Sequence, residues 1–259
     1  MLRPRHVEVQ VLADRHGHVV SLGDRDCSVQ RRNQKLIEEA PAWGLSPALR
    51  KRMGEAAVAA ARAVGYESAG TVEFLLEEDR FYFMEINTRI QVEHGITELV
   101  TGVDLVRQQI RIAAGLPLGL RQEDVTLTGH AIECRVNAED PAAGFRPCPG
   151  TASFVHFPGG TGVRVDSALY TGYTMPPYYD SLAAKLLVHA PTRLEAIRRM
   201  RRALEELTIE GFATNAELSH LILHHPDYVR GACTTAFLEQ HLQELVDWNR
   251  RAEESEAAQ

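Results

Sequence analysis

Residues 84–94, MEINTRIQVEH, decide how the fold is interpreted, because polar and apolar residues alternate along them. An extended backbone points successive side chains to opposite faces of a sheet. One face would then hold the polar residues Glu85, Asn87, Arg89, Gln91 and Glu93. Alternation of this kind is most often typical of a strand whose polar face meets water, and that is the simplest interpretation of the stretch.

The preceding residues 71–83, TVEFLLEEDRFYF, predict the partner strand of a β-hairpin, with turn residues at 77–80. Centring the turn on Asp79 pairs Glu73 with Glu85 and Thr71 with Asn87. Two carboxylates directly opposite each other are unfavourable by up to ~1 kcal/mol, and a Mg²⁺ ion held by both, with Asn87 beside them, would compensate. The alternative is a shifted register, which sends the two acids to separate, solvated positions.

Arg89 and Glu93 follow the proposed metal residues closely in sequence. An arginine can bind a carboxylate or bicarbonate through two parallel hydrogen bonds, and a desolvated glutamate can act as a general base. Each residue alone is weak support, since exposed Arg and Glu usually only interact with solvent. The order of the residues is what favours a functional site.

The composition is that of an ordinary globular protein of 259 residues, with 28 Lys and Arg against 35 Asp and Glu and a net charge of −7. This balance argues against a broad surface for nucleic acid or anionic membrane. The four cysteines are far apart and form no C-x-x-C pair, so neither a zinc knuckle nor a disulfide framework is indicated.

No apolar run approaches the ~20 residues needed to cross a bilayer, and the first residues contain no hydrophobic signal core. We therefore expect a cytoplasmic protein. An alternating run, residues 6–11, begins almost at Met1 and predicts a strand with no structure before it, so we expect a piece of a longer protein.

Capping signals predict most of the helices. Ser46-Pro47 is a good start and Gly65 a good stop for one helix, and Thr192 with Glu195 forms a capping box for another that ends before Gly211. Further predicted segments are a helix over 104–114, strands over 129–136 and 182–189, short strands within 141–162, a helix starting at 214 or 215, and a frayed charged tail from 248.

Six strings in order carry a resemblance to a known family. They are RHVEVQVLAD (5–14), RDCSVQRRNQKLIEEAP (25–41), GTVEFL (70–75), FYFMEINTRIQVEH (81–94), GHAIECRVNAEDP (129–141) and GYTMPPYYDSLAAKL (172–186). The chain resembles the C-terminal region of biotin carboxylase over residues 5–239. Biotin carboxylase is an ATP-grasp enzyme and the catalytic component of carboxylases of acetyl-CoA, propionyl-CoA and pyruvate.

The resemblance implies an α+β fold with a mainly antiparallel sheet and flanking helices. It implies the C-terminal half of an ATP-grasp domain over residues 1–115, with the Mg-ATP and bicarbonate residues. The biotin carboxylase C-terminal domain would follow over 116–245, and a charged tail over 246–259.

The family's site residues carry over to matching positions. By resemblance, Glu73, Glu85 and Asn87 would hold the magnesium ions that bridge the ATP phosphates, which are the residues that the hairpin argument also selects. Bicarbonate would be bound by Lys35, Arg89, Gln91 and the backbone of Val92. Glu93 would remove the bicarbonate proton so that carboxyphosphate forms, and Arg89 would stabilise the developing negative charge.

Other positions match residues that line the biotin and nucleotide pockets. Arg135 would hold the ureido oxygen of biotin, with Asp180 near it, and His6 and Gln30 would line the nucleotide or bicarbonate pocket. If the resemblance is set aside, the simpler interpretation is that Arg135 pairs with an acid such as Asp180 or Glu133. Likewise Lys35 would be at a helix end, and His6 and Gln30 would be exposed strand or loop residues.

Two positions depart from the family pattern. The family has His where this chain has Asn33, at a position that resembles a nucleotide contact. Asn can donate a hydrogen bond but carries no charge, so we expect the ATP affinity to be affected. The family has Pro where this chain has Gly95, which loosens the backbone just beyond the proposed base.

The family's glycine-rich phosphate loop is not found in the sequence. The nearest candidate, residues 158–162, lacks a lysine, and the chain contains no M-K-M biotinylation motif. The implied partners are therefore a biotin carboxyl carrier protein, carboxyltransferase subunits and the N-terminal half of biotin carboxylase, with a second copy of the chain as a homodimer. No nucleic acid or membrane is implied.

Three interpretations follow. The chain is a piece of a biotin carboxylase, or a non-catalytic dimerisation or binding module with the same fold, or another ATP-grasp ligase. Arg135, Asp180 and the bicarbonate residues argue against the last, because these positions serve biotin and bicarbonate. We expect the first, with ATP, Mg²⁺ and bicarbonate bound and biotin on a separate carrier.

Overall fold

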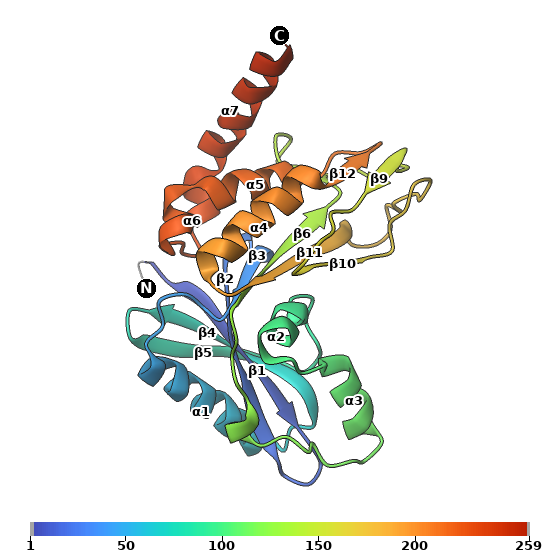
Figure 1. Cartoon of the computed structure of the whole chain (residues 1–259). Helices are drawn as coiled ribbons and strands as arrows, with labels where there is room; N and C mark the ends of the chain where they lie inside the picture. The colour runs from blue at the N-terminus through green and yellow to red at the C-terminus, as the bar shows by residue number, and fades with distance from the viewer. Residues whose placement is uncertain (1–2, 258–259) are drawn as a thin grey trace. The chain divides into compact units, whose positions relative to one another are not determined.

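The computed structural model describes the backbone of residues 3–257 and the side chains of residues 3–248. The chain divides into two compact units (Figure 1). Unit 1 combines the residues up to Ser28 with Glu38–Ala131, and unit 2 combines Val29–Ile37 with the residues from Ile132 on. Two strands, β2 and β3, have residues in both units, so each unit is described separately below.

Unit 1 is an antiparallel sheet with helices. Its strands follow the order β2-β1-β4-β5. The elements are β1 (Arg5–Ala13), most of β2 (Val19–Arg31), the end of β3 (Gln34–Ala40), α1 (Pro47–Ala63), β4 (Ser68–Glu77), β5 (Arg80–Asn87), α2 (His94–Thr101), α3 (Leu105–Ala113) and the short 3-10 helix η1 (Gln122–Asp124).

Helices α1 and α3 cover opposite faces of the unit 1 sheet. Val7, Val9 and Val11 of β1 pack in one core cluster with α1, whereas Leu12 packs in another cluster with α3. Neighbouring residues of a strand point to opposite faces, so the two clusters lie on opposite sides of β1. Strand β1 is therefore buried on both faces, and its polar side chains at positions 6, 8 and 10 are buried with it.

Asp14 fixes the turn between β1 and β2. Its carboxylate accepts hydrogen bonds from the backbone N–H groups of His16 (2.8 Å), His18 (3.0 Å) and Leu118 (2.8 Å) and lies 2.9 Å from Nδ1 of His18. Burial raises the pKa of Asp14, but these hydrogen bonds outweigh it and lower the pKa to about 2. The carboxylate thus ties the β1–β2 turn to the segment after α3.

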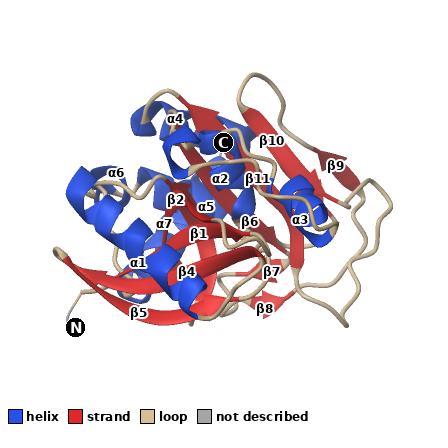
Figure 2. Cartoon of the chain, turned by 90° about the horizontal axis from the view of Figure 1, so that it is seen from below, coloured by secondary structure: helices blue, strands red, loops and turns tan. Residues whose placement is uncertain are grey.

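Unit 2 contains the strand order β10-β11-β6-β3 and a layer of helices. Strands β10 and β11 run side by side in Figure 2. The elements of unit 2 are the end of β2, the start of β3, β6 (His130–Asn137, from Ile132 on), β7 (Glu139–Asp140), β8 (Arg146–Pro147), β9 (Phe154–His156), β10 (Val163–Ser167), β11 (Leu182–Ala190), α4 (Arg193–Glu206), β12 (Thr208–Glu210), α5 (Ala216–His224), α6 (Pro226–Arg230) and α7 (Phe237–Ala257).

The unit 2 core joins α4 and α5 to the sheet. Ile197, Met200 and Leu204 of α4 pack with Leu218 and Ile222 of α5 in a buried cluster. The chain begins α4 with the predicted capping box, in which Thr192 accepts a hydrogen bond from the Glu195 N–H and the Glu195 carboxylate accepts one from the Thr192 N–H. Because this apolar face of α4 packs on the core, the polar face of the helix is directed to solvent.

The predicted α+β fold with a mainly antiparallel sheet is confirmed. The helix starts predicted at Pro47 and at Asp104, which caps α3, are also confirmed. Two local predictions were wrong. The alternating stretch is a strand only as far as Asn87, since α2 begins at His94, and the tail predicted to fray continues α7 as a helix to Ala257.

The β4–β5 hairpin has the predicted register at its functional end, but for a different reason. Its turn contains two residues, Glu78 and Asp79, with Glu77 opposite Arg80. A β-bulge beside Phe74 then adds Met84 to β5 without a partner on β4, which shifts the register by one residue. As a result, Glu73 lies opposite Glu85 and Thr71 opposite Asn87, as predicted from a turn centred on Asp79.

Candidate active site

A fully buried arginine lies at the centre of the polar layer of unit 1. Arg25, on β2, is 0% exposed and uses all of its N–H groups in one network. Its acceptors are Oε1 of Glu8 (2.6 Å), Oε1 of Gln10 (2.7 Å), Oγ1 of Thr97 (2.9 Å), Oγ1 of Thr71 (3.1 Å) and Oε1 of Gln91 (2.9 Å). Strands β1, β2 and β4, helix α2 and the segment before α2 are thereby held by a single side chain.

The charge of Arg25 is compensated by two buried carboxylates. Burial would lower the pKa of the guanidinium, but Glu8 and Glu93 raise it above its ordinary value. One donor atom each from Glu8, Glu93 and the buried Cys27 lie within 4.8 Å of one another. Glu93, the predicted base, is thus held next to a permanent positive charge and is only 1% exposed.

Gln91 connects the hydrogen-bond network of Arg25 to Glu73, one of the predicted metal residues. Its Oε1 accepts from Arg25, so its Nε2 is the donor, and it donates to Oε1 of Glu73 over 2.7 Å. Nε2 of His6 lies 2.9 Å from Oε2 of the same carboxylate. Glu73 is therefore buried and held from two sides.

Asn87 joins the two facing carboxylates of the hairpin. Its Nδ2 donates to Glu73 over 3.0 Å and to Glu85 over 3.2 Å. The side-chain amide therefore offsets the repulsion between the two acids. When the amide is turned over it presents its oxygen instead, and two carboxylates with an amide oxygen are hard ligands of the kind that Mg²⁺ binds. Glu85 is exposed, so the group is open to solvent along β5.

The segment between β5 and α2 carries the other predicted unit 1 residues. Arg89 is exposed and donates to the carbonyl of the neighbouring Ile90 over 3.3 Å. Val92 is half-buried, and Glu93 is the N-cap residue of α2. Gly95 lies in the first turn of this helix, where a proline, as in the resembling family, would be tolerated and would restrict the backbone.

Two predicted residues of unit 2 are buried. Gln30 is 7% exposed and Lys35 is 9% exposed. His6 of unit 1 is also buried, so the alternative in which His6 and Gln30 are exposed is wrong. Lys35 lies within β3 and not at a helix end.

Asn33 occupies the tight turn between β2 and β3. The two turn residues, Arg32 and Asn33, have positive φ angles of 48° and 67°. A two-residue hairpin turn with both φ angles positive favours Asn strongly. The departure from the family's His at this position therefore matches the backbone, and the Asn33 side chain is exposed.

Arg135 and Asp180 complete the predicted set in unit 2. Arg135 is half-buried on β6, and its carbonyl oxygen accepts a hydrogen bond from Nδ2 of the buried Asn215 over 3.0 Å. Asp180 is exposed in the segment before β11, next to Ser181. Asn215 also accepts from the Asn137 N–H (2.7 Å), so it fixes the β6 backbone on both sides of Val136.

The network around Arg25 was not predicted from the sequence, and neither were the roles in it of Glu8, Gln10, Thr71 and Thr97. A signal was present, because positions 6, 8 and 10 of β1 are polar on one face, as are Thr71 and Glu73 of its neighbour β4. Polar faces on two adjacent strands predict a shared polar layer, and Arg25 is the group that satisfies it.

Two family models match this chain, and related proteins of known name share most of its length. Residues 1–121 match the family model of the ATP binding domain of the carbamoyl-phosphate synthase L chain, and residues 133–240 match that of the biotin carboxylase C-terminal domain. The biotin carboxylase of Nostoc sp. is 56% identical over 239 residues, which are 92% of this chain and 54% of that protein. The chain belongs to the biotin carboxylase family.

Other relatives share the same region. The biotin carboxylase 1 of Bacillus subtilis is 56% identical over 92% of this chain and 53% of its own length. The chain therefore spans about half the length of the curated relatives that it matches.

Solved structures of biotin carboxylase domains have the same fold. The domain dimer of 2-oxoglutarate carboxylase from Hydrogenobacter thermophilus, in complex with MgADP, ADP and bicarbonate, has a TM-score of 0.91 and 51% identity over 93% of this chain and 54% of that chain. The multifunctional pyruvate carboxylase of Rhizobium etli has a TM-score of 0.89 and 47% identity over 92% of this chain and 24% of that chain. Among the described helices of the present chain, none is both long and apolar enough to pass through a bilayer.

Proposed function

We propose that the chain is the C-terminal region of a biotin carboxylase. It would supply the metal, bicarbonate and biotin residues for an enzyme that carboxylates biotin with ATP and bicarbonate through carboxyphosphate. The observation that carries this proposal is the connected group Glu73, Asn87, Glu85 and Gln91, which the buried Arg25 holds in place.

The cation residues would be Glu73, Glu85 and Asn87. Bound Mg²⁺ would neutralise charge on the ATP phosphates. The chain's own contribution is to hold Glu73 rigid, through Gln91 and His6, while Glu85 stays accessible on β5. The complex of the related 2-oxoglutarate carboxylase domain with MgADP and bicarbonate supports this assignment.

Bicarbonate would be bound next to the same group. The Gln91 Nε2 has two hydrogens, of which one is donated to Glu73, so the other can be donated to a bicarbonate oxygen. Arg89 and the Val92 N–H would bind the remaining oxygens. The Glu93 carboxylate, shielded from water, would accept the bicarbonate proton.

Biotin on a separate carrier protein would be held by Arg135, with Asp180 near it. We include in the proposal a homodimer, carboxyltransferase partners, the N-terminal half of the enzyme, and a cytoplasmic location. The N-terminal half would supply the phosphate-binding lid, and the relatives named above support this because they extend well beyond the matched region.

The test is biotin-dependent ATP hydrolysis in bicarbonate. The full chain is assayed alone and mixed with the N-terminal half of the Nostoc relative, after gel filtration has established that the two associate. We expect activity only in the mixture, and loss of it in Glu93→Gln. An associated mixture without activity contradicts the proposal and favours a dimerisation or binding module.

A further inference from the structure

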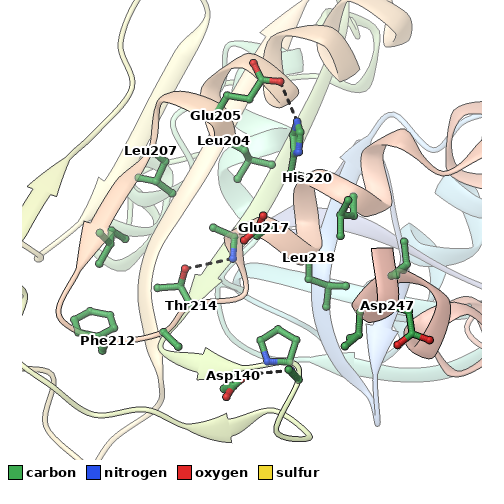
Figure 3. A pocket seen from close by; sticks show the side chains of 18 of the residues that line it. Asp140, Leu204, Glu205, Leu207, Phe212, Thr214, Glu217, Leu218, His220 and Asp247 are labelled. Carbon is green, nitrogen blue, oxygen red and sulfur yellow. Dashed lines mark hydrogen bonds and ion pairs between the residues drawn. The ribbon is translucent and has the colours of Figure 1, made fainter. Parts of the chain in front are cut away.

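Two helices of unit 2 bring together a carboxylate and two imidazoles, none of which is assigned to the carboxylase site. Glu205 lies in the last turn of α4, and His220 and His224 lie on α5. The histidines are four residues apart, so they lie on the same face of the helix, one turn from each other. Figure 3 shows Glu205 and His220 directed toward each other.

The distances are close to those of a metal site. His220 Nε2 lies 3.1 Å from Glu205 Oε1, and the two imidazole ring centroids are 4.7 Å apart. One donor atom from each residue lies within 4.8 Å of the others. A tetrahedral Zn²⁺ ion with ligands about 2.0–2.1 Å away needs its donor atoms about 3.3 Å apart. These side chains are exposed or half-buried, so they can rotate to bring the donor atoms from within 4.8 Å of one another to about 3.3 Å.

We propose that Glu205, His220 and His224 bind a divalent transition metal ion, with Zn²⁺ as the favoured ion. Two imidazole nitrogens and one carboxylate oxygen suit Zn²⁺, whereas Mg²⁺ prefers oxygen ligands alone. A helical pair of histidines four residues apart is also the spacing that zinc enzymes use to bind the ion from one helix. Three protein ligands leave the fourth tetrahedral position for water or a small ligand.

The surroundings leave room for that fourth ligand. Glu205 and His220 are also among the residues that line a cavity of about 1060 Å³ in unit 2, with Leu204, Leu218 and Leu221. The donor atoms are therefore not enclosed by protein on every side. The cavity also exposes the site to solutes without any change in the backbone.

One neighbouring charge opposes a cation. Arg201 lies one turn before Glu205 on α4, and its guanidinium donates to the Leu223 carbonyl over 2.7 Å. The guanidinium is thus bound to the backbone of α5, at the residue before His224.

A second histidine cluster in unit 2 is less suitable and supplies a control. His225, His241 and Glu244 also bring donor atoms within 4.8 Å of one another. However, Nδ1 of His225 accepts the Asp227 N–H (3.2 Å), and its ring packs against those of Phe237 and Trp248. The His225 ring is therefore used in capping and packing, and we expect this second cluster to bind no metal. His241→Ala, which removes a member of that cluster, should then leave metal binding unchanged.

The test is calorimetric titration of Zn²⁺ into the full, EDTA-treated chain. We expect one site per chain, and His220→Ala and His224→Ala should each weaken binding at least tenfold, with Glu205→Gln weakening it less. Far-UV circular dichroism checks that the variants fold; His224 and Glu205 are exposed, so they can be changed without disturbing the core. The proposal is overturned if His220→Ala and His224→Ala both bind Zn²⁺ as tightly as the unchanged chain, or if His241→Ala loses binding.

X-ray absorption at the zinc edge identifies the ligands independently. We expect two imidazole nitrogens and an oxygen at about 2.0–2.2 Å, and sulfur at about 2.3 Å would instead assign the ion to cysteine and refute the site. Neither measurement uses ATP, bicarbonate or biotin. Failure here therefore leaves the proposed carboxylase function untouched, and failure of that function leaves the metal site intact.

Discussion

Replacing Arg25 with methionine should destabilise unit 1 strongly while changing its shape little. Methionine keeps most of the volume of the side chain but removes every one of its N–H donors. The carboxylate of Glu8, which is 0% exposed, would lose its charged partner at 2.6 Å. Breaking a buried ion pair by removing one partner typically costs about 3–5 kcal/mol. We expect a loss of this size in the free energy of unfolding of unit 1.

A second substitution tests whether the charge of the Glu8 carboxylate, once Arg25 is removed, is the cause. Glu8→Gln removes the carboxylate charge, so the double variant Glu8→Gln, Arg25→Met should be less destabilised than the sum of the single variants, by about 2 kcal/mol. Arg62→Met is the matched control, because Arg62 is exposed near the end of α1. Its effect should stay within about 0.5 kcal/mol.

The chain offers a specific probe for each unit. Its two tryptophans are Trp43, in unit 1, and Trp248, in unit 2. Urea unfolding followed by Trp43 fluorescence in a Trp248→Phe background therefore reports unit 1. Additive effects of Glu8→Gln and Arg25→Met, to within about 0.5 kcal/mol, would refute the reasoning, because independent sites add in this way.

Three further predictions concern other parts of the chain. Glu85→Gln should weaken Mg²⁺ binding at least tenfold without loss of stability, because Glu85 is exposed; calorimetry measures this, with Glu78→Gln in the hairpin turn as the control. The pKa of Asp14 is lowered to about 2, so its contribution to stability is present above the unfolded-state pKa and is lost as the pH falls from about 4 to 2. Asp14→Asn should remove this part of the acid dependence of Trp43-monitored unfolding. Asn215→Ala should destabilise unit 2 by about 2–3 kcal/mol, measured through Trp248, because the Asn137 N–H and the Arg135 carbonyl lose a buried partner. An unchanged stability would show that water replaces the amide.

The local signals in the sequence were sufficient for the starts of α1, α3 and α4 and for the functional end of the hairpin. Capping signals at Ser46 and Thr192 predicted helix starts directly, and the structure begins α1 and α4 at these places. The pairing of Glu73 with Glu85 was also predicted, yet the bulge at Met84 was not. A bulge results from packing across the sheet, and no individual residue in the hairpin signals it.

The extended interpretation of residues 84–94 failed beyond Asn87 because alternation cannot distinguish a strand from a loop that leads into a short helix. Helix α2 contains eight residues, and its N-cap residue, Glu93, provides no side-chain cap bond. Its start is therefore weakly encoded. The side chains of Gln91 and Glu93 still reach the polar layer, since tertiary hydrogen bonds to Arg25 and the charge of Arg25, and not strand periodicity, determine their direction.

Strand β5 stands at the end of the strand order of unit 1, and Tyr82, Phe83 and Met84 along it are 45–57% exposed. An apolar strand at a sheet edge is a template onto which another polypeptide can add by backbone pairing. The same few residues continue into Glu85 and Asn87. Aggregation of the chain and its affinity for divalent cations should therefore change together, since whatever covers this edge also controls how an ion reaches the carboxylates.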